Sequence, residues 1–257
     1  MLQTAIEAAQ RAGQVIAARY LDPHHVTVKG YRDIVTEADA AAETVILNLI
    51  RERFPQHAIL SEEAGGDELD ADCLWVVDPI DGTTNYAHRI PIFCVSIAVL
   101  QAGQPVLGVI HDPMRDQTFV AERGRGAWRD GAPIHASRVE TLAHTVVGVD
   151  WGHKDEVRAQ ILDYVQRVAP HCGTVRALGS AALALAYVAA GWLDAYFHLG
   201  LKPWDVAAAM LLIAEAGGRC TTIQGEPFHV NLPGCLATNG LLHQDLLTAL
   251  GTAKAAD

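Results

Sequence analysis

Two carboxylates lie close together at the end of a predicted buried strand. The segment WVVDPIDGTTNYAH, residues 75–88, passes from β-forming apolar residues into Asp78 and Asp81. Each carboxylate is costly to bury alone, because desolvation penalises its charged form. Hard cations such as Mg²⁺ prefer carboxylate and carbonyl oxygens, and Pro79 fixes its own φ, so both acids and the Ile80 carbonyl can point toward one place. The segment therefore predicts a site for hard cations.

A predicted helix start follows these two acids. Gly82, Thr83 and Thr84 have the composition of the first turn of a helix, whose free N–H groups bind anions. A cation site beside an anion site suits a phosphate ester, because one metal ion would activate a water molecule and another would hold the leaving oxygen. These residues thus point to chemistry on a phosphate ester.

Three further acids lie next to a predicted strand end or helix start. Glu62 and Glu63 follow the short strand in HAILSEE, and Asp205 stands in the sequence PWD, while Asp39 is a weaker candidate. Each acid has an ordinary interpretation when it is taken alone. An acid before a helix is most often an N-cap, a loop acid is usually solvated, and D-P-x-D-G can form a type I turn.

The composition limits the classes of function. The chain has 257 residues, half of them apolar and 19% charged, which suits one large domain or two intimate halves with a substantial core. The formal net charge of −11 opposes general binding to nucleic acid or anionic membranes, since phosphate binding needs a basic face. Five cysteines without a C-x-x-C pair argue against a disulfide framework or a zinc ribbon, and favour free thiols in a reducing compartment.

No segment has the character of a signal peptide or a membrane span. Residues 1–20 have the pattern of an amphipathic helix, without the apolar region of a signal peptide. The most apolar stretch, residues 181–193, is shorter than the roughly 20 residues that a bilayer crossing needs. We therefore expect a soluble cytoplasmic protein with no membrane partner.

The elements that must position the acids are of mixed type. A turn and loop that includes Pro23 is expected over residues 21–33, and helical spacing marks residues 36–54. Residues 93–128 alternate β-rich runs with turn signals, which predicts an antiparallel meander. From about residue 145 onward, short strands alternate with helices. The pattern indicates mixed α and β layers rather than a pure Rossmann sheet.

A boundary between two halves is expected near residues 137–145, where nothing has the composition of a flexible linker. We expect one domain over residues 1–257, with an N-terminal α+β half of about residues 1–140. The C-terminal half, of about residues 141–257, is expected to be α/β.

Four motifs resemble those of the inositol monophosphatase family. WVVDPIDGTTNYAH is similar to its metal-binding signature, W-x-x-D-P-I-D-G-T-T-N-F, and residues 204–218, WDVAAAMLLIAEAGG, match its second signature, W-D-x-A-A-…-E-A-G-G. DIVTEAD at residues 33–39 and ILSEEAG at residues 59–65 match further landmarks in the family's order. The resemblance covers nearly the whole chain. It implies a Mg²⁺-dependent, lithium-sensitive phosphomonoesterase that forms a homodimer. It also implies an α+β fold, the layered α-β-α-β-α sandwich of the inositol monophosphatase/fructose bisphosphatase type.

The resemblance also implies a set of metal ligands. Glu62, Asp78 and the Ile80 carbonyl would hold a first Mg²⁺ ion. Asp78, Asp81 and Asp205 would hold a second, so that Asp78 bridges both ions. A third, weaker ion would lie near Glu62, largely through water, which gives two to three Mg²⁺ ions per site.

The catalytic residues that the resemblance implies are Glu62, Thr83 and Asp81. Thr83 and Glu62 would orient and deprotonate the attacking water, whose pKa is lowered on the metal. The backbone N–H groups of Gly82 and Thr83 would hold the phosphate. Catalysis would then be mostly positioning and electrostatics, without a covalent phosphoenzyme.

Several residues are expected to support the metal ligands. The resemblance places Lys29 and Asp33 on a mobile loop near the metal ions, although Lys29 can equally be a solvated loop lysine. Asp39 is expected to contact the metal ligands rather than the metal ions. Glu63 is expected either to do the same or to be a solvated acid. Glu215 is expected to be structural, because it and Asp205 stand at opposite ends of the same predicted helix.

A further group of residues is expected to contact the substrate. The segment GSAA, residues 179–182, aligns with backbone contacts to substrate, although it also has the pattern of a capped helix start. His198 stands where family members usually place a Glu that accepts bonds from inositol hydroxyls, although a lone His is more often structural. The expected substrate-binding residues are Gly82, Thr83, Gly179, Ser180, Ala181, His198 and Asp205.

The His198 departure has a chemical consequence. A His offers one acceptor at best and can carry a positive charge. Together with Lys202 and Arg176, it predicts a leaving-group pocket that is less acidic than usual in the family and tolerates a second anionic group. Thr84 favours inositol-type substrates instead, because relatives that act on histidinol phosphate or nucleotide 3′-phosphates often have Lys there.

Three hypotheses for function follow. The favoured one is Mg²⁺-dependent hydrolysis of a small-molecule phosphate monoester, inositol 1-phosphate to inositol and phosphate. The alternative enzyme is a fructose-1,6-bisphosphatase-like or broad sugar phosphatase. The non-enzyme alternative is a transcription- or RNA-associated factor that uses the basic segment RGRGAWR, residues 123–129. A Gly-rich hairpin is the favoured interpretation of that segment, and the overall charge opposes nucleic-acid binding.

Overall fold

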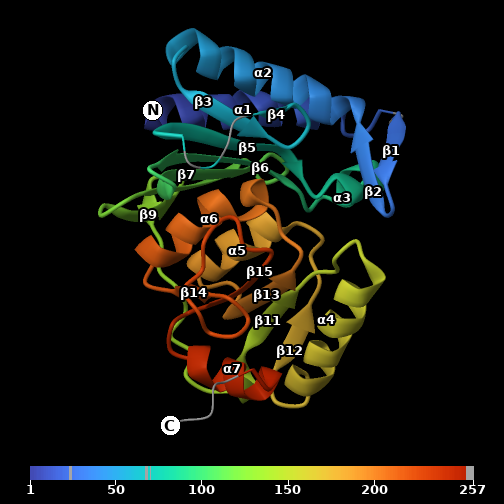
Figure 1. Ribbon diagram of the computed structural model, residues 1–257, viewed down its shortest axis with the longest axis vertical. Coiled ribbons are helices and arrows are strands. Elements are labelled where there is room, and N and C mark those ends of the chain that lie inside the picture. The colour runs from blue at the N-terminus through green and yellow to red at the C-terminus, as the bar shows by residue number, and fades with distance from the viewer. Residues whose placement is uncertain (23–24, 67–68, 70, 253–257) are drawn as a thin grey trace.

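The protein is built from two large β-sheets and three layers of helices (Figure 1). The computed structural model describes residues 1–22, 25–66, 69 and 71–252. One helix pair covers an eight-stranded sheet, a second pair separates this sheet from a five-stranded sheet, and two more helices cover the outer face of the five-stranded sheet. This α-β-α-β-α order confirms the predicted fold class.

The outer helix pair consists of α1 (Leu2–Arg19) and α2 (Glu37–Arg53), close to the predicted bounds. α1 buries alanines at helical spacing from Ala5 to Ala12, and their small size lets α2 and the sheet approach closely. α2 begins with a capping box in which Thr36 and Asp39 exchange side-chain and backbone hydrogen bonds. The cap fixes Asp39 within hydrogen-bond distance of Thr83, which follows β5.

The eight-stranded sheet contains the predicted meander. Its spatial order is β10-β9-β8-β7-β6-β5-β3-β4; β3 and β5 run parallel, and the other neighbours run antiparallel. β5 is buried along nearly its whole length, as its run of apolar residues predicted. The strands are β3 (Ala58–Ser61), β4 (Gly65–Gly66), β5 (Cys73–Asp81), β6 (Cys94–Gln101), β7 (Gln104–Asp112), β8 (Gln117–Glu122), β9 (Gly126–Arg129) and β10 (Ala132–Pro133).

The loop predicted over residues 21–33 is wrong for residues 26–30 and 33, which lie in strands. β1 (Val26–Gly30) and β2 (Asp33–Thr36) form an antiparallel hairpin, because β-branched residues on both strands outweigh the turn signals around them. Arg32 takes the positive φ of 61° that closes the turn. Pro23 lies outside the described residues. The mobility expected for this segment stays a prediction.

Two apolar helices occupy the space between the sheets. α5 (Ala181–Ala189) and α6 (Pro203–Glu215) pack against each other and against strands of both sheets. Both are rich in alanine and buried on most of their surface, which explains their weak amphipathic pattern. At the closest approach, a Cβ on Gly108 of β7 would lie 2.5 Å from the Ala208 carbonyl oxygen, so only glycine fits there.

The five-stranded sheet has the order β12-β11-β13-β15-β14, with β11 parallel to both β12 and β13. α4 and α7 share an apolar cluster with its outer face. Among the residues that the structure describes, none of the helices combines the length and apolar character that a membrane crossing needs. The elements are η1 (Leu142–His144), β11 (Val146–Val149), α4 (Asp155–Val168), β12 (Thr174–Arg176), β13 (Ala195–Leu199), β14 (Arg219–Thr221), β15 (Gly234–Thr238) and α7 (His243–Leu250).

All five cysteines are free thiols, and Cys94 and Cys235 are fully buried. This agrees with the absence of a disulfide framework that their spacing predicted. The division of the chain near residues 137–145 stays a prediction.

Candidate active site

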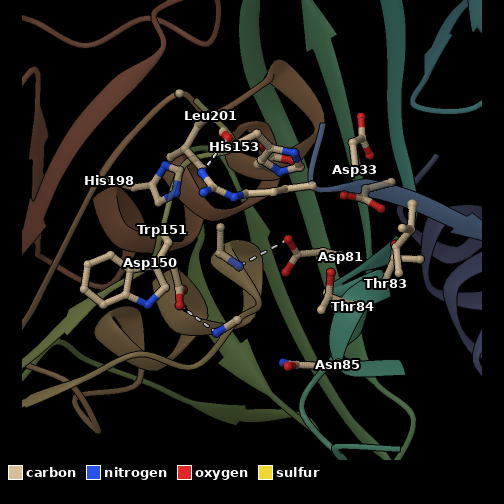
Figure 2. Close-up of a pocket in the computed structure, with 18 of the residues that line it drawn as sticks. Asp33, Asp81, Thr83, Thr84, Asn85, Asp150, Trp151, His153, His198 and Leu201 are labelled. Atoms are coloured by element: carbon tan, nitrogen blue, oxygen red, sulfur yellow. Dashed lines mark hydrogen bonds between the residues drawn. The ribbon is translucent and has the colours of Figure 1, made fainter. Parts of the chain in front are cut away.

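A cavity of about 370 Å³ opens where the end of β5 meets α3 (Thr83–Ala87) and the first turns of α5 and α6 (Figure 2). Most of the residues predicted for the site come together here. Ser180 and Lys29 are not among the lining residues, but they bond to Asp81 and Glu62, which are. The predicted residues that line the cavity are Asp33, Glu62, Asp78, Ile80, Asp81, Gly82, Thr83, Gly179, Ala181, His198 and Asp205.

A β-bulge turns Asp78 and Asp81 toward the same side of β5. In a regular strand, residues three positions apart point to opposite faces. Here Asp78 pairs with Ser96 and Asp81 pairs with Cys94, so β5 takes three steps where β6 takes two. The extra residue restores a common direction for the two acids, and Pro79, which has no N–H to donate, lies inside the bulge.

Asp205 joins these two acids from the first turn of α6. Its carboxylate accepts a hydrogen bond of 2.7 Å from the backbone N–H of Lys202, which is the capping role expected of an acid at this position. Carboxylate oxygens of Asp78, Asp81 and Asp205 also lie within 4.8 Å of one another. Asp205 thus takes part in the cap of α6 from inside its first turn, and its role as a metal ligand stays a prediction.

The electrostatics of this cluster are unfavourable without a cation. Burial raises the pKa of Asp78 well above its ordinary value, and the charges of Glu62 and Asp81 raise it further. Burial likewise raises the pKa of Asp205, with the charge of Asp81 as the next cause. Asp78 is 1% exposed, and its Oδ1 has no hydrogen-bond partner in the described part of the chain. A buried, unpaired carboxylate oxygen in an all-oxygen donor set fits a hard divalent cation.

Glu62 lies at the rim of the cluster, just after β3. Its pKa is raised to about 7, because burial outweighs the opposing charge of Lys29. Lys29 Nζ lies 3.1 Å from Glu62 Oε1 and 2.6 Å from Glu63 Oε1, and 3.8 Å from Asp33 Oδ1. Lys29 thus pairs with the acids of the site while it stays exposed to solvent. The role expected of Glu63 stays a prediction.

Thr83 is held at the start of α3. Its hydroxyl lies 3.0 Å from the Ile80 carbonyl oxygen and 3.1 Å from Asp39 Oδ1, so it can donate to either. Asp39 therefore supports Thr83 from behind. Gly82 precedes it with a φ of +101°, and a Cβ there would lie 3.1 Å from the Gly179 carbonyl oxygen. Both the backbone conformation and the close approach require glycine at this position.

The first turn of α5 is directed at Asp81. The Ser180 hydroxyl donates to Asp81, and the backbone N–H groups of Ala181 and Ala182 donate to it at 3.2 and 3.0 Å. These bonds lower the pKa of Asp81, but burial outweighs them and the pKa is raised overall. Ser180 is the N-cap residue of α5, but its hydroxyl binds Asp81 instead of capping the helix. The contact of this segment with substrate stays a prediction.

Of the two charge states that the sequence leaves open for His198, the structure favours the neutral one. It is 6% exposed, and burial lowers its pKa to about 4, so the ring is neutral near pH 7. The ring is hydrogen-bonded to the backbone of Trp151, and Nδ1 has no partner among the described residues. Lys202 and Arg176, which the sequence associated with this pocket, are absent from the described residues that line it.

Sequence reasoning missed several residues of the cavity. Arg32 and Arg158 line it, but each is engaged: Arg32 donates to Asp155 at 2.7 Å, and Arg158 donates to the Gly152 carbonyl oxygen at 2.7 Å. Asp150 was also missed, although it directly follows the apolar strand β11, much as Asp78 directly follows the apolar run of β5. The missed lining residues include Arg32, Asn85, Asp150, Trp151, His153 and Arg158.

Comparisons with known proteins agree with this geometry. The family described as the inositol monophosphatase family matches residues 1–255. Nus factor SuhB of Escherichia coli strain K12 is 44% identical over 229 residues, which cover 88% of this chain and 86% of that protein. An extragenic suppressor protein suhB from Bartonella henselae has a TM-score of 0.93 at 35% identity, covering 96% of this chain and 97% of that one. An inositol monophosphatase from Anabaena has a TM-score of 0.87 at 39% identity, covering 97% and 94%.

Proposed function

The chain belongs to the inositol monophosphatase family, and from this premise we propose that it is a Mg²⁺-dependent phosphatase whose substrate is inositol 1-phosphate. The observation that carries the proposal is the cluster of Asp78, Asp81 and Asp205, whose oxygens lie within 4.8 Å of one another beside the first turns of three helices. An unpaired buried oxygen on Asp78 supports a cation there. Membership of the family supports phosphatase activity in general, and the choice of alcohol is our own inference.

The metal ligands that we propose are those implied by the resemblance. Glu62, Asp78 and the Ile80 carbonyl would hold one ion, and Asp78, Asp81 and Asp205 another. Bound Mg²⁺ supplies a more acidic water and stabilises a leaving oxygen. Two to three ions per site, lithium sensitivity and a homodimer belong to the same proposal.

The chain's own residues position the reactants. Thr83 is fixed between the Ile80 carbonyl and Asp39, so its hydroxyl oxygen has a defined position for accepting a hydrogen bond from the attacking water. Glu62 would take the proton, and the N–H groups of Gly82 and Thr83 would bind the phosphate. Because these groups are held before substrate arrives, little reorganisation is needed as charge develops.

The leaving-group side of the cavity favours an alcohol with hydroxyl groups. His198 is neutral near pH 7, and its unpartnered Nδ1 can accept a hydrogen bond. The two arginines that line the cavity are engaged by other groups, which leaves less positive charge for a second phosphate. This supports the inositol ester over a sugar bisphosphate.

The test is Mg²⁺-dependent release of phosphate from inositol 1-phosphate, fructose 1,6-bisphosphate, histidinol phosphate and a nucleotide 3′-phosphate, with Asp78→Asn as control. We expect the highest kcat/KM for the inositol ester and no release by the control. A His198→Glu variant should change the ratio of kcat/KM between the inositol ester and the bisphosphate. Release from none of the four substrates in the presence of Mg²⁺ would remove the proposal.

A second candidate is a transcription- or RNA-associated role, which the 44% identity to proteins named Nus factor SuhB favours. The basic segment over residues 123–129 gives it little support. Arg123 donates two hydrogen bonds, of 2.9 and 2.6 Å, to the Pro105 carbonyl oxygen. The Glu215 carboxylate accepts hydrogen bonds from the backbone N–H groups of Gly124 and Gly126. This segment is therefore a hairpin turn held by internal hydrogen bonds. Specific RNA binding that persists in Asp78→Asn would establish this second role.

A further inference from the structure

One peptide group beside the acid cluster is clamped from both sides. Figure 2 shows one of the two hydrogen bonds, as a dashed line from Asp150. Its carbonyl oxygen, on Leu178, accepts a hydrogen bond of 2.8 Å from Asn85 Nδ2. Its N–H, on Gly179, donates at 2.7 Å to Asp150 Oδ1. Asn85 belongs to α3 beside the eight-stranded sheet, whereas Asp150 follows β11 of the five-stranded sheet. The two parts of the chain therefore hold a single peptide plane between them.

This peptide plane directly precedes the donors that hold Asp81. Gly179 turns the chain with a φ of +76°, and Ser180 is the N-cap of α5. The Ser180 hydroxyl and the next two backbone N–H groups all donate to the Asp81 carboxylate. A rotation of the clamped peptide would displace these donors, because Gly179 is the residue between them and the clamp.

The clamp is buried and closely fitted. Asp150 is 7% exposed and Asn85 is 8% exposed. Asn85 also donates to the Ile92 carbonyl oxygen at 2.7 Å, and a Cβ on Gly179 would meet the Asn85 amide at 2.7 Å. The hydrogen-bond partners of Asp150 are neutral: the backbone of Leu178 and Gly179, and the Tyr196 hydroxyl, which is 3.2 Å from Oδ2. Burying a carboxylate against neutral donors is costly, so its presence calls for a role.

We propose that Asp150 and Asn85 are positioning residues of this active site, which clamp the Leu178–Gly179 peptide and thereby aim the α5 donors that hold Asp81 ready for a metal ion. Neither residue touches the reacting atoms. Only the activity measurement in this proposal rests on the proposed function. Metal binding by the acid cluster can be measured without any substrate.

The informative variants at position 150 differ in whether they leave a hydrogen-bond acceptor for the Gly179 N–H. Asp150→Ala removes its acceptor, whereas Asp150→Asn keeps an oxygen in the same place and removes only the charge. We expect Asp150→Ala to weaken metal binding and kcat by about tenfold or more each, in the range found for groups that orient metal ligands, with KM changed little. Asp150→Asn should stay within about threefold of the parent protein, since the bond to a neutral N–H survives.

Matched variants separate the clamp from a general loss of packing. Tyr196→Phe removes the other hydrogen bond of Asp150 and leaves the Gly179 bond, so it should behave like the parent protein. Asn85→Ala should reproduce the defect of Asp150→Ala from the opposite side. Because both residues act on one peptide group, the double variant should be far less impaired than the product of the two single defects.

The measurement is titration of the metal-free protein with Mn²⁺, followed by electron paramagnetic resonance, beside Mg²⁺-dependent phosphate release. Thermal unfolding shows that each variant is folded; if Asp150→Ala is not, Asn85→Ala carries the same expectation. Parent-like Mn²⁺ affinity in both alanine variants, or an Asp150→Asn protein as impaired as Asp150→Ala, would overturn the clamp. If the alanine variants lose Mn²⁺ affinity but the parent protein hydrolyses none of the substrates, the clamp is supported and the proposed function is refuted.

Discussion

Replacing Asp78 with asparagine should stabilise the metal-free protein while it destroys the site. Asp78, Asp81 and Asp205 offer oxygens within 4.8 Å of one another. At this separation, two full charges repel by about 3.5 kcal/mol at an effective dielectric constant of about 20. Partial protonation relieves some of that repulsion, so we expect the free energy of unfolding to rise by about 2–4 kcal/mol. For a chain of this size, the corresponding rise in Tm is about 5–10 °C.

The expected dependence on pH follows from the protons bound in each state. The pKa of Asp78 is raised by burial first and then by the Glu62 charge, so the folded protein keeps a proton that the unfolded chain has released above about pH 4. Without metal, stability therefore falls as the pH rises from about 4 toward the raised pKa, and the penalty is complete above it. The Asp78→Asn side chain has no such proton to lose. The Tm of Asp78→Asn should therefore exceed that of the parent protein by more at pH 8 than at pH 5.

The assay is thermal unfolding in EDTA and then in Mg²⁺, with phosphate release measured on the same samples. Asp163, an exposed acid on α4, provides the control variant Asp163→Asn, which should shift stability by less than about 0.5 kcal/mol. Saturating Mg²⁺ should raise the Tm of the parent protein much more than that of Asp78→Asn, because only a ligand-competent site gains binding energy. An Asp78→Asn protein with equal or lower Tm than the parent in EDTA at pH 8 would refute the reasoning.

Three further changes test other parts of the structure. Gly108→Ala forces a Cβ to within 2.5 Å of the Ala208 carbonyl oxygen and should cost about 1–3 kcal/mol in urea unfolding, because β7 and α6 must separate. Gly82→Ala, at a φ of +101°, should cost about 1–3 kcal/mol and lower phosphate release far more than stability, since it displaces Thr83. Burial lowers the pKa of His243 to about 4, so the unfolded chain takes up a proton as the pH falls from about 6.5 to 4, and stability drops by up to about 3 kcal/mol. Urea unfolding of His243→Gln across this range should show a smaller slope with pH than the parent protein, and an equal slope would contradict the assignment.

The acids of the cluster could be predicted from sequence because the features that place them are local. Asp78 and Asp81 are three residues apart, with a proline between them at the position of the bulge. Asp205 stands two residues after a proline in the first turn of a helix, where its carboxylate takes part in the helix cap and lies close to the other two acids. In each case a few consecutive residues determine the backbone that directs the side chain.

The hairpin over residues 26–36 and the contacts of Asp150 could not be predicted in this way. Every residue of β1 is exposed, so this strand lacks the alternation of buried and exposed residues by which strands are recognised. Asp150 meets Tyr196 because β11 lies beside β13, and it meets Gly179, which follows β12, because β12 is the other neighbour of β11. Both pairings join residues far apart in the chain. The charge state of His198 could not be chosen from the sequence either, because burial rather than residue type sets its pKa.

The arrangement of helices around the acids explains why a cluster of three carboxylates can be tolerated between two apolar layers. The first turn of α5 donates to Asp81, and the first turn of α6 holds Asp205 through the Lys202 N–H. A helix N-terminus carries about half a positive charge, which offsets part of the repulsion without cancelling it. The remaining imbalance appears as carboxyl groups with raised pKa values rather than as salt bridges. A divalent cation that enters the cluster must therefore displace protons, which couples its binding to pH through the chain's own architecture.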